Sequence, residues 1–158
     1  MHSLAAGVGD LKKVLTNVKT RGIWGEMQLG NLIRQTLAPD QYEENIAVVP
    51  DSSERVEFAI RLPDRTGGTI LLAVDSKFPQ EDYVRLAEAS QAGDAAGAEA
   101  ARKALTQRLR AEAKKIASKY IAPPHTADFA VMFLPVEGLY AEAIQSPDLV
   151  EEIGRAHV

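Results

Sequence analysis

Apolar residues recur at helical spacing over the first part of the chain. From Ser3 to Lys19 every third or fourth residue is apolar, which predicts an amphipathic helix. A second apolar stripe predicts another helix from about Gly22 to Leu37. That helix must end before Pro39, because a proline disfavours helical backbone in the residue that precedes it. The two stripes are Leu4, Val8, Leu11, Leu15 and Val18, and then Ile23, Leu29, Ile33 and Leu37.

The pattern then changes to that of β-strands. Residues 45–49 predict a short strand, and the alternation of apolar and polar residues over 55–62 predicts a strand with one buried face. Residues 69–77 are apolar almost to their end, as in a strand buried on both faces. The short turn over residues 63–68 predicts that the last two strands form an antiparallel hairpin, in which symmetry about the turn pairs Leu62 with Ile70.

Helical periodicity returns in the second half of the chain. Pro79 suits the first turn of a helix, and the helical pattern runs to about Tyr120 with a break over residues 92–97. A strand buried on both faces is expected over residues 128–135. Because a long helical connection precedes it, this strand should lie parallel to a neighbour. A final helix is expected from about Gly138 towards Ile144.

Composition narrows the class of protein. The 158 residues, 46% hydrophobic and 25% charged, are enough for one globular domain. The absence of cysteine excludes disulfides and thiolate metal sites, and the three histidines show no ligand spacing. No apolar run approaches the roughly 18 to 20 residues that span a bilayer, and no signal peptide is apparent, so we expect a cytoplasmic chain without a membrane segment. The net charge of −4 argues against a protein that coats nucleic acid by bulk charge, although a local basic groove remains compatible with it.

The buried run of residues 69–77 ends in two charged side chains, those of Asp75 and Lys77. Residues two apart on a strand share a face, so the acid and the amine point the same way. The hairpin register places Glu57 opposite Asp75, with Cβ atoms about 4.5 to 5.5 Å apart. Opposed carboxylates repel unless a cation lies between them, and hard oxygen ligands suit Mg²⁺ or Mn²⁺. The pattern indicates a metal-dependent nuclease site. Taken singly, Glu57 could instead pair with a neighbouring arginine, and Asp75 with Lys77 in a surface ion pair.

A third acid, Glu26, lies on the apolar side of its predicted helix. An unpaired carboxylate there would be costly, and an approach to the metal or its water would satisfy it. The alternative is that Glu26 lies in the first turn of the helix, where the helix dipole favours acids.

The order of a helix acid, a strand acid and Asp-x-Lys on the next strand resembles the PD-(D/E)XK nuclease superfamily. The flanking residues resemble the RmuC family of DNA recombination proteins, and they cover most of the chain from about Leu15 onward. The matching stretches are Lys19–Leu29, Arg61–Asp64, Val74–Pro79, Tyr83 and Val131–Glu137.

The resemblance implies an α/β fold with a restriction-endonuclease-like core, a mixed central sheet flanked by helices, over residues 20–158. Residues 1–19 would form the N-terminal amphipathic helix that precedes it. It also implies action on branched or hairpin DNA in recombination, limiting rearrangement at inverted repeats. RmuC-like proteins usually carry a membrane-proximal segment with a coiled coil and further sequence after the core. We therefore expect this chain to be a truncated core of a membrane-anchored parent.

The resemblance also implies roles for individual residues. Asp75 and Glu57 would hold Mg²⁺ or Mn²⁺, with the Ser76 carbonyl as a further ligand, and Glu26 would bind a metal water. Lys77 would orient the attacking water and stabilise charge on the phosphate. Contacts to DNA are expected from Arg21, Trp24 and Arg55, although packing is the alternative for Trp24.

One position departs from the family pattern. The family usually has Pro-Asp where this chain has Val56-Glu57, so the carboxylate is kept with one more methylene and the metal geometry or the activity is expected to differ. Two other classes of function stay open. One is a non-catalytic module that binds DNA or protein, and the other is a scaffold that forms homo-oligomers through the helix from Leu4 to Val18.

Overall fold

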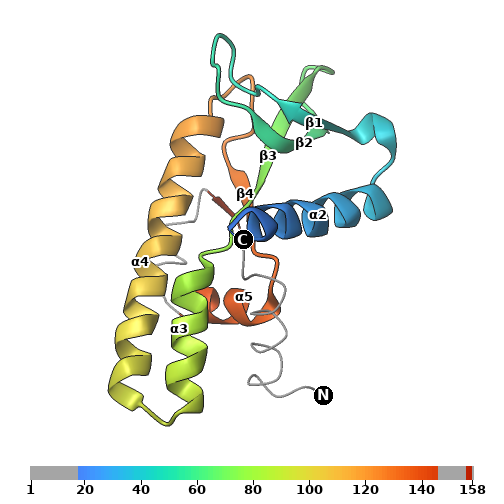
Figure 1. Cartoon of the computed structure of the whole chain (residues 1–158). Coiled ribbons are helices and arrows are strands. Elements are labelled where there is room, and N and C mark those ends of the chain that lie inside the picture. The colour runs from blue at the N-terminus through green and yellow to red at the C-terminus, as the bar shows by residue number, and fades with distance from the viewer. Residues whose placement is uncertain (1–17, 146–155, 158) are drawn as a thin grey trace.

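The sheet of this protein lies between two layers of helices (Figure 1). The structure is a computed structural model that describes the backbone of residues 18–145 and 156–157 and the side chains of residues 27–145. Five strands pair in the order β1-β2-β3-β4-β5. They are β1 (Tyr42–Ile46), β2 (Val56–Pro63), β3 (Thr69–Ser76), β4 (Ala130–Phe133) and β5 (Ala156–His157). The first three are antiparallel, and β3, β4 and β5 are parallel, which confirms the predicted mixed sheet of an α/β protein.

Four α-helices accompany the sheet among the described residues, together with a short 3-10 helix, η1. Their bounds are α2 (Val18–Thr36), η1 (Pro39–Gln41), α3 (Gln80–Gln91), α4 (Ala95–Tyr120) and α5 (Glu137–Ile144). The sequence predicts one helix that ends at Lys19 and a second that begins at about Gly22. This separation is wrong, because α2 is continuous from Val18. The predicted end before Pro39, the interruption between α3 and α4, and the final helix are confirmed.

The strand predicted over residues 45–49 is displaced in the structure. β1 ends at Ile46, and Asn45 within it has a left-handed φ of 49°. Val48 is buried in the core although it belongs to no strand. The apolar residues that suggested a strand are thus core residues of a connecting segment, and the pairing with β2 begins earlier, at Tyr42. The short β5 was not predicted, because two residues carry no periodicity.

The hairpin of β2 and β3 has the predicted register, with Leu62 opposite Ile70. Its turn is held by the Asp64 carboxylate, whose Oδ1 accepts hydrogen bonds from Thr66 N (2.7 Å), Thr66 Oγ1 (2.7 Å) and Gly68 N (2.9 Å). Gly67 adopts a φ of 87°, which glycine tolerates without a Cβ clash.

These bonds predict a pH dependence of stability. The hydrogen bond from the Thr66 side chain, then those from the backbone N–H groups of Thr66 and Gly68, hold the pKa of Asp64 below its ordinary value of 3.8. Because the folded pKa is lowered, the stabilisation is present above the ordinary value and is lost as the pH falls through the lowered one. Asp64→Ala should therefore reduce the urea midpoint more at pH 7 than at pH 2. The same difference at both pH values would contradict this, and Asp128→Ala, at an exposed aspartate outside the turn, is the control.

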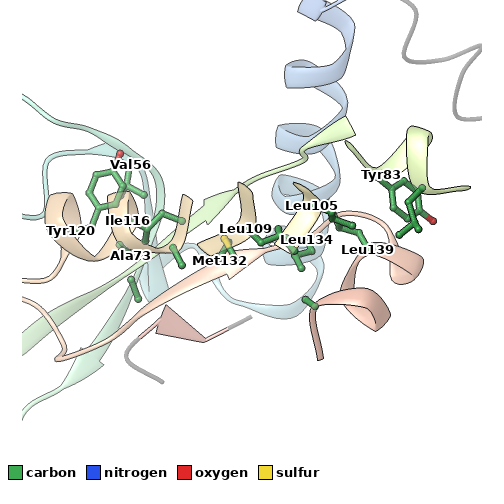
Figure 2. Close-up of a cluster of buried hydrophobic side chains, with 14 of the residues drawn as sticks. Val56, Ala73, Tyr83, Leu105, Leu109, Ile116, Tyr120, Met132, Leu134 and Leu139 are labelled. Carbon is green, nitrogen blue, oxygen red and sulfur yellow. The ribbon is translucent and has the colours of Figure 1, made fainter. Parts of the chain in front are cut away.

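The two faces of the sheet carry separate cores. On one face α2 packs through Leu29 and Ile33 against Phe58 and Val74. The other face is covered by α4, which contributes Leu105, Leu109, Ala113, Ile116 and Tyr120 to the larger core, as its apolar stripe predicts. Figure 2 shows this core running along α4, from Val56 and Tyr120 at one end to Tyr83 and Leu139 at the other. The central strand β3 is therefore buried on both faces towards its end, and a charged side chain there needs a polar partner.

The helix expected over residues 3–19 lies outside the described residues, apart from Val18 and Lys19 at the start of α2. The same is true of the homo-oligomer contact expected through it. Within the part of the chain that the structure describes, none of the helices combines the length and the apolar character needed to cross a membrane.

Candidate metal and nuclease site

Asp75 lies near the end of β3, on the face of the sheet that α4 covers. Alternation along the strand places it on the side of Ala73, which is wholly buried in the larger core. Asp75 itself is only 6% exposed and lies opposite Met132 of β4. A carboxylate this deep must be compensated by a cation or by hydrogen bonds.

Glu57 lies near the beginning of β2, at the same end of the hairpin. The antiparallel pairing ends at Phe58 and Val74, so Glu57 and Asp75 are the next two residues along the same register. Asp75 points to the α4 side of the sheet, with Ala73 one pleat further along, and Glu57 lines a cavity together with Met27 and Arg34 of α2. The negative charges of both acids act on Lys77 and on Tyr120. The tertiary structure thus brings Glu57, Asp75 and Lys77 into one region.

The ammonium group of Lys77 lies between two carboxylates. Its Nζ is 3.2 Å from Asp75 Oδ2 and 3.8 Å from Glu112 Oε2. Burial alone would lower the pKa of Lys77, but the charge and hydrogen bond of Asp75, then the charges of Glu112 and Glu57, outweigh burial and raise it. Lys77 is therefore a fixed positive charge at neutral pH, suited to stabilising an anion.

Two residues of α4, Glu112 and Tyr120, complete the surroundings of the acids and were not predicted. Tyr120 donates a hydrogen bond to the Arg55 carbonyl (3.2 Å), which ties the start of β2 to α4. Burial, then the charge of Asp75, raises the pKa of the Tyr120 hydroxyl. A signal for Glu112 existed: it lies three residues after Leu109 and four before Ile116, on the buried stripe of the helix.

Three of the predicted residues, Arg21, Trp24 and Glu26, lie on the first half of α2. Their side chains are outside the described residues, so their expected roles stay predictions. The next residue described, Met27, lines a cavity of about 400 Å³ together with Glu57. The middle of α2 therefore borders the same cavity as one of the strand acids.

Arg55 lines this cavity too. Its guanidinium donates to the backbone carbonyl of Asn45 (2.8 Å from Nη2) and, from Nε, to the side-chain oxygen of Asn45 (3.3 Å). These bonds hold Arg55 against β1, and its side chain is exposed. The remaining predicted residue, Ser76, ends β3 opposite Phe133.

The carboxylate oxygens in this region suit a hard divalent cation. Among the side chains that the structure describes, no group of three or more His, Asp or Glu residues could form a metal site. A centre made from them would rest on two carboxylates, those of Glu57 and Asp75. Mg²⁺ is usually bound by one or two carboxylates, with water and substrate phosphate oxygens in the other positions. Two acids beside an ammonium therefore fit Mg²⁺ or Mn²⁺ bound together with a phosphate.

Comparison with known proteins places the chain among relatives named for DNA recombination. A family model described as "RmuC family" matches residues 1–158. The chain is 50% identical over 159 residues to the DNA recombination protein RmuC homolog of Xylella fastidiosa (strain Temecula1), which covers 99% of this chain and 35% of that protein. It is 28% identical over 154 residues to the homolog of Chlamydia muridarum, covering 94% of this chain and 33% of the relative. The chain thus spans about a third of the length of these relatives. No solved structure matches it.

Proposed function

This chain belongs to the RmuC family, and from that membership we propose that it acts on DNA in recombination by metal-dependent hydrolysis of phosphodiester bonds. The observation that carries the proposal is that the buried Asp75 lies beside Lys77. Asp75 and Glu57 are the next two residues beyond the last pair of the hairpin, Phe58 with Val74. Asp-x-Lys on a central strand, with an acid on the adjacent strand, is the arrangement of the PD-(D/E)XK nucleases, and we assign the chain to that superfamily as part of the proposal. Branched or hairpin DNA, such as inverted repeats form, is the proposed substrate.

Each residue has a role in this proposal. Asp75 and Glu57 would hold Mg²⁺ or Mn²⁺, assisted by the Ser76 carbonyl, and Glu26 would hold a metal water. When bound, the metal supplies charge neutralisation and a water of lowered pKa. Lys77 would stabilise the negative charge that grows on the phosphate and orient the attacking water. Arg21, Trp24 and Arg55 would bind the DNA backbone or an unpaired base.

The test is cleavage of linear, hairpin and branched DNA in the presence of Mg²⁺ or Mn²⁺. Asp75→Asn removes a charged ligand with almost no change of shape, so metal-dependent cleavage should fall by about a hundredfold or more. Asp82→Asn is the matched control, since Asp82 is a similarly shielded acid that pairs with Arg108 (3.7 Å) away from the site. Cleavage by Asp75→Asn at the rate of the original chain would refute the proposed site.

A second candidate function is a non-catalytic DNA-binding module. It is favoured by one observation, that the strand acid is Glu57, one methylene longer than the aspartate usual at this position of the family. This alternative predicts that the original chain and Asp75→Asn bind branched DNA equally and that neither cleaves it at any Mn²⁺ concentration.

A further inference from the structure

Lys77 is shared between two elements that are far apart in the sequence. Asp75 belongs to β3 and Glu112 to α4, and both carboxylates approach the same ammonium group. The side chains of Asp75 and Glu112 are 8% and 16% exposed, whereas that of Lys77 is 34% exposed. The lysine thus reaches towards solvent from between two shielded acids.

The two carboxylates are not equivalent in the proposed reaction. Asp75 Oδ2, the oxygen that now faces the lysine, belongs to the residue proposed to bind the metal. An ammonium and a divalent cation on one carboxylate repel each other, so metal binding weakens the pair of Lys77 with Asp75. The carboxylate left to hold the ammonium is that of Glu112.

We propose that Glu112 is a positioning residue, which keeps Lys77 in the site while Asp75 binds the metal ion. This inference rests on the proposed function. Glu112 is suited to the role because Leu109 and Ile116, on either side of it, are each 1% exposed and anchor that part of α4 against the sheet. Its second oxygen, Oε1, lies 3.9 Å from the exposed Lys115, which leaves Oε2 directed at Lys77.

A double-mutant cycle on Mn²⁺ affinity tests the inference without depending on cleavage. In Glu112→Gln the ammonium of Lys77 stays on Asp75 and competes with the metal, so Mn²⁺ should bind about 3- to 10-fold more weakly. In the Lys77→Met background the competitor is gone, and the same substitution should change the affinity less than about twofold. Glu112→Asp, which keeps the charge, should recover part of the affinity, and Glu99→Gln on the same helix should have no effect.

Cleavage provides a second readout. Glu112→Gln should lower kcat about tenfold and leave KM for DNA unchanged, because the lysine is misplaced rather than lost. Thermal unfolding midpoints of the variants within a few degrees of the original chain establish that each one folds.

The outcomes separate the two proposals. Equal losses of Mn²⁺ affinity in both backgrounds would make Glu112 a direct metal ligand and overturn its positioning role, and no loss in either would overturn it as well. If the original chain binds no Mn²⁺, the proposed metal site fails and this inference fails with it. If Mn²⁺ binds with the expected coupling but no DNA is cleaved, only the proposed hydrolysis fails.

Discussion

Replacing Lys77 with methionine should reduce metal-dependent DNA cleavage by about 100- to 1,000-fold, the usual cost of removing one group that stabilises transition-state charge. Methionine keeps most of the length and apolar stem of lysine and removes only the ammonium. The measurement is single-turnover cleavage of hairpin or branched DNA at saturating Mg²⁺. Lys119→Met is the matched control, because Lys119 is an exposed lysine that pairs with Glu54 (3.7 Å).

Lys77→Met should strengthen metal binding, although it slows cleavage. Without its ammonium partner, the buried Asp75 is left as an uncompensated charge, and the metal-free protein should lose about 1–3 kcal/mol of unfolding free energy. The lower part of this range is expected, since Lys77 is 34% exposed and water offsets part of the loss. Mg²⁺ should then bind more tightly and raise the melting temperature of Lys77→Met more than that of the original chain. An equal response of both proteins to Mg²⁺ would show that the metal does not bind at Asp75.

Leu109→Ala should destabilise the fold by about 3 kcal/mol, within the 2–5 kcal/mol typical of large-to-small core substitutions. Leu109 is 1% exposed and lies in the middle of the core that α4 forms with the sheet, beside Met132 and Leu134 (Figure 2). The measurement is the change in the urea midpoint at a constant slope of the transition.

Leu32→Ala is the control for this substitution, because Leu32 is 50% exposed on α2 and should cost less than about 0.5 kcal/mol. A loss at Leu109 as small as the loss at Leu32 would mean that α4 does not pack on the sheet as described. Glu112 would then have no fixed position relative to Lys77, and its proposed role would be untenable.

The local pattern of apolar and polar residues predicted most of the helices and strands. The alternation of residues 55–62, the length of the turn and the apolar run after it were enough to place Leu62 opposite Ile70. The apolar stripe of α4 could be recognised in the sequence, because a helix that covers a sheet must have one apolar face. The bounds of β1 were not predictable in this way. Val48 and Val49 are apolar because they pack in or against the larger core, although they belong to no strand.

The candidate site likewise has a part that the sequence predicts and a part that it does not. Asp75 lies near the end of β3 and Lys77 directly follows that strand, while Glu57 follows from the hairpin register, so the sequence by itself determined that an ammonium and two acids share one end of the sheet. Glu112 is 35 positions beyond Lys77 and reaches it only because α3 and α4 form a helical pair that returns along the sheet (Figure 1). Only the tertiary structure decided that contact and the depth at which Asp75 is buried. The physical reason is that strand and turn geometry act between neighbours in the chain, whereas the packing of a helix on a sheet depends on all the residues that fill the space between them.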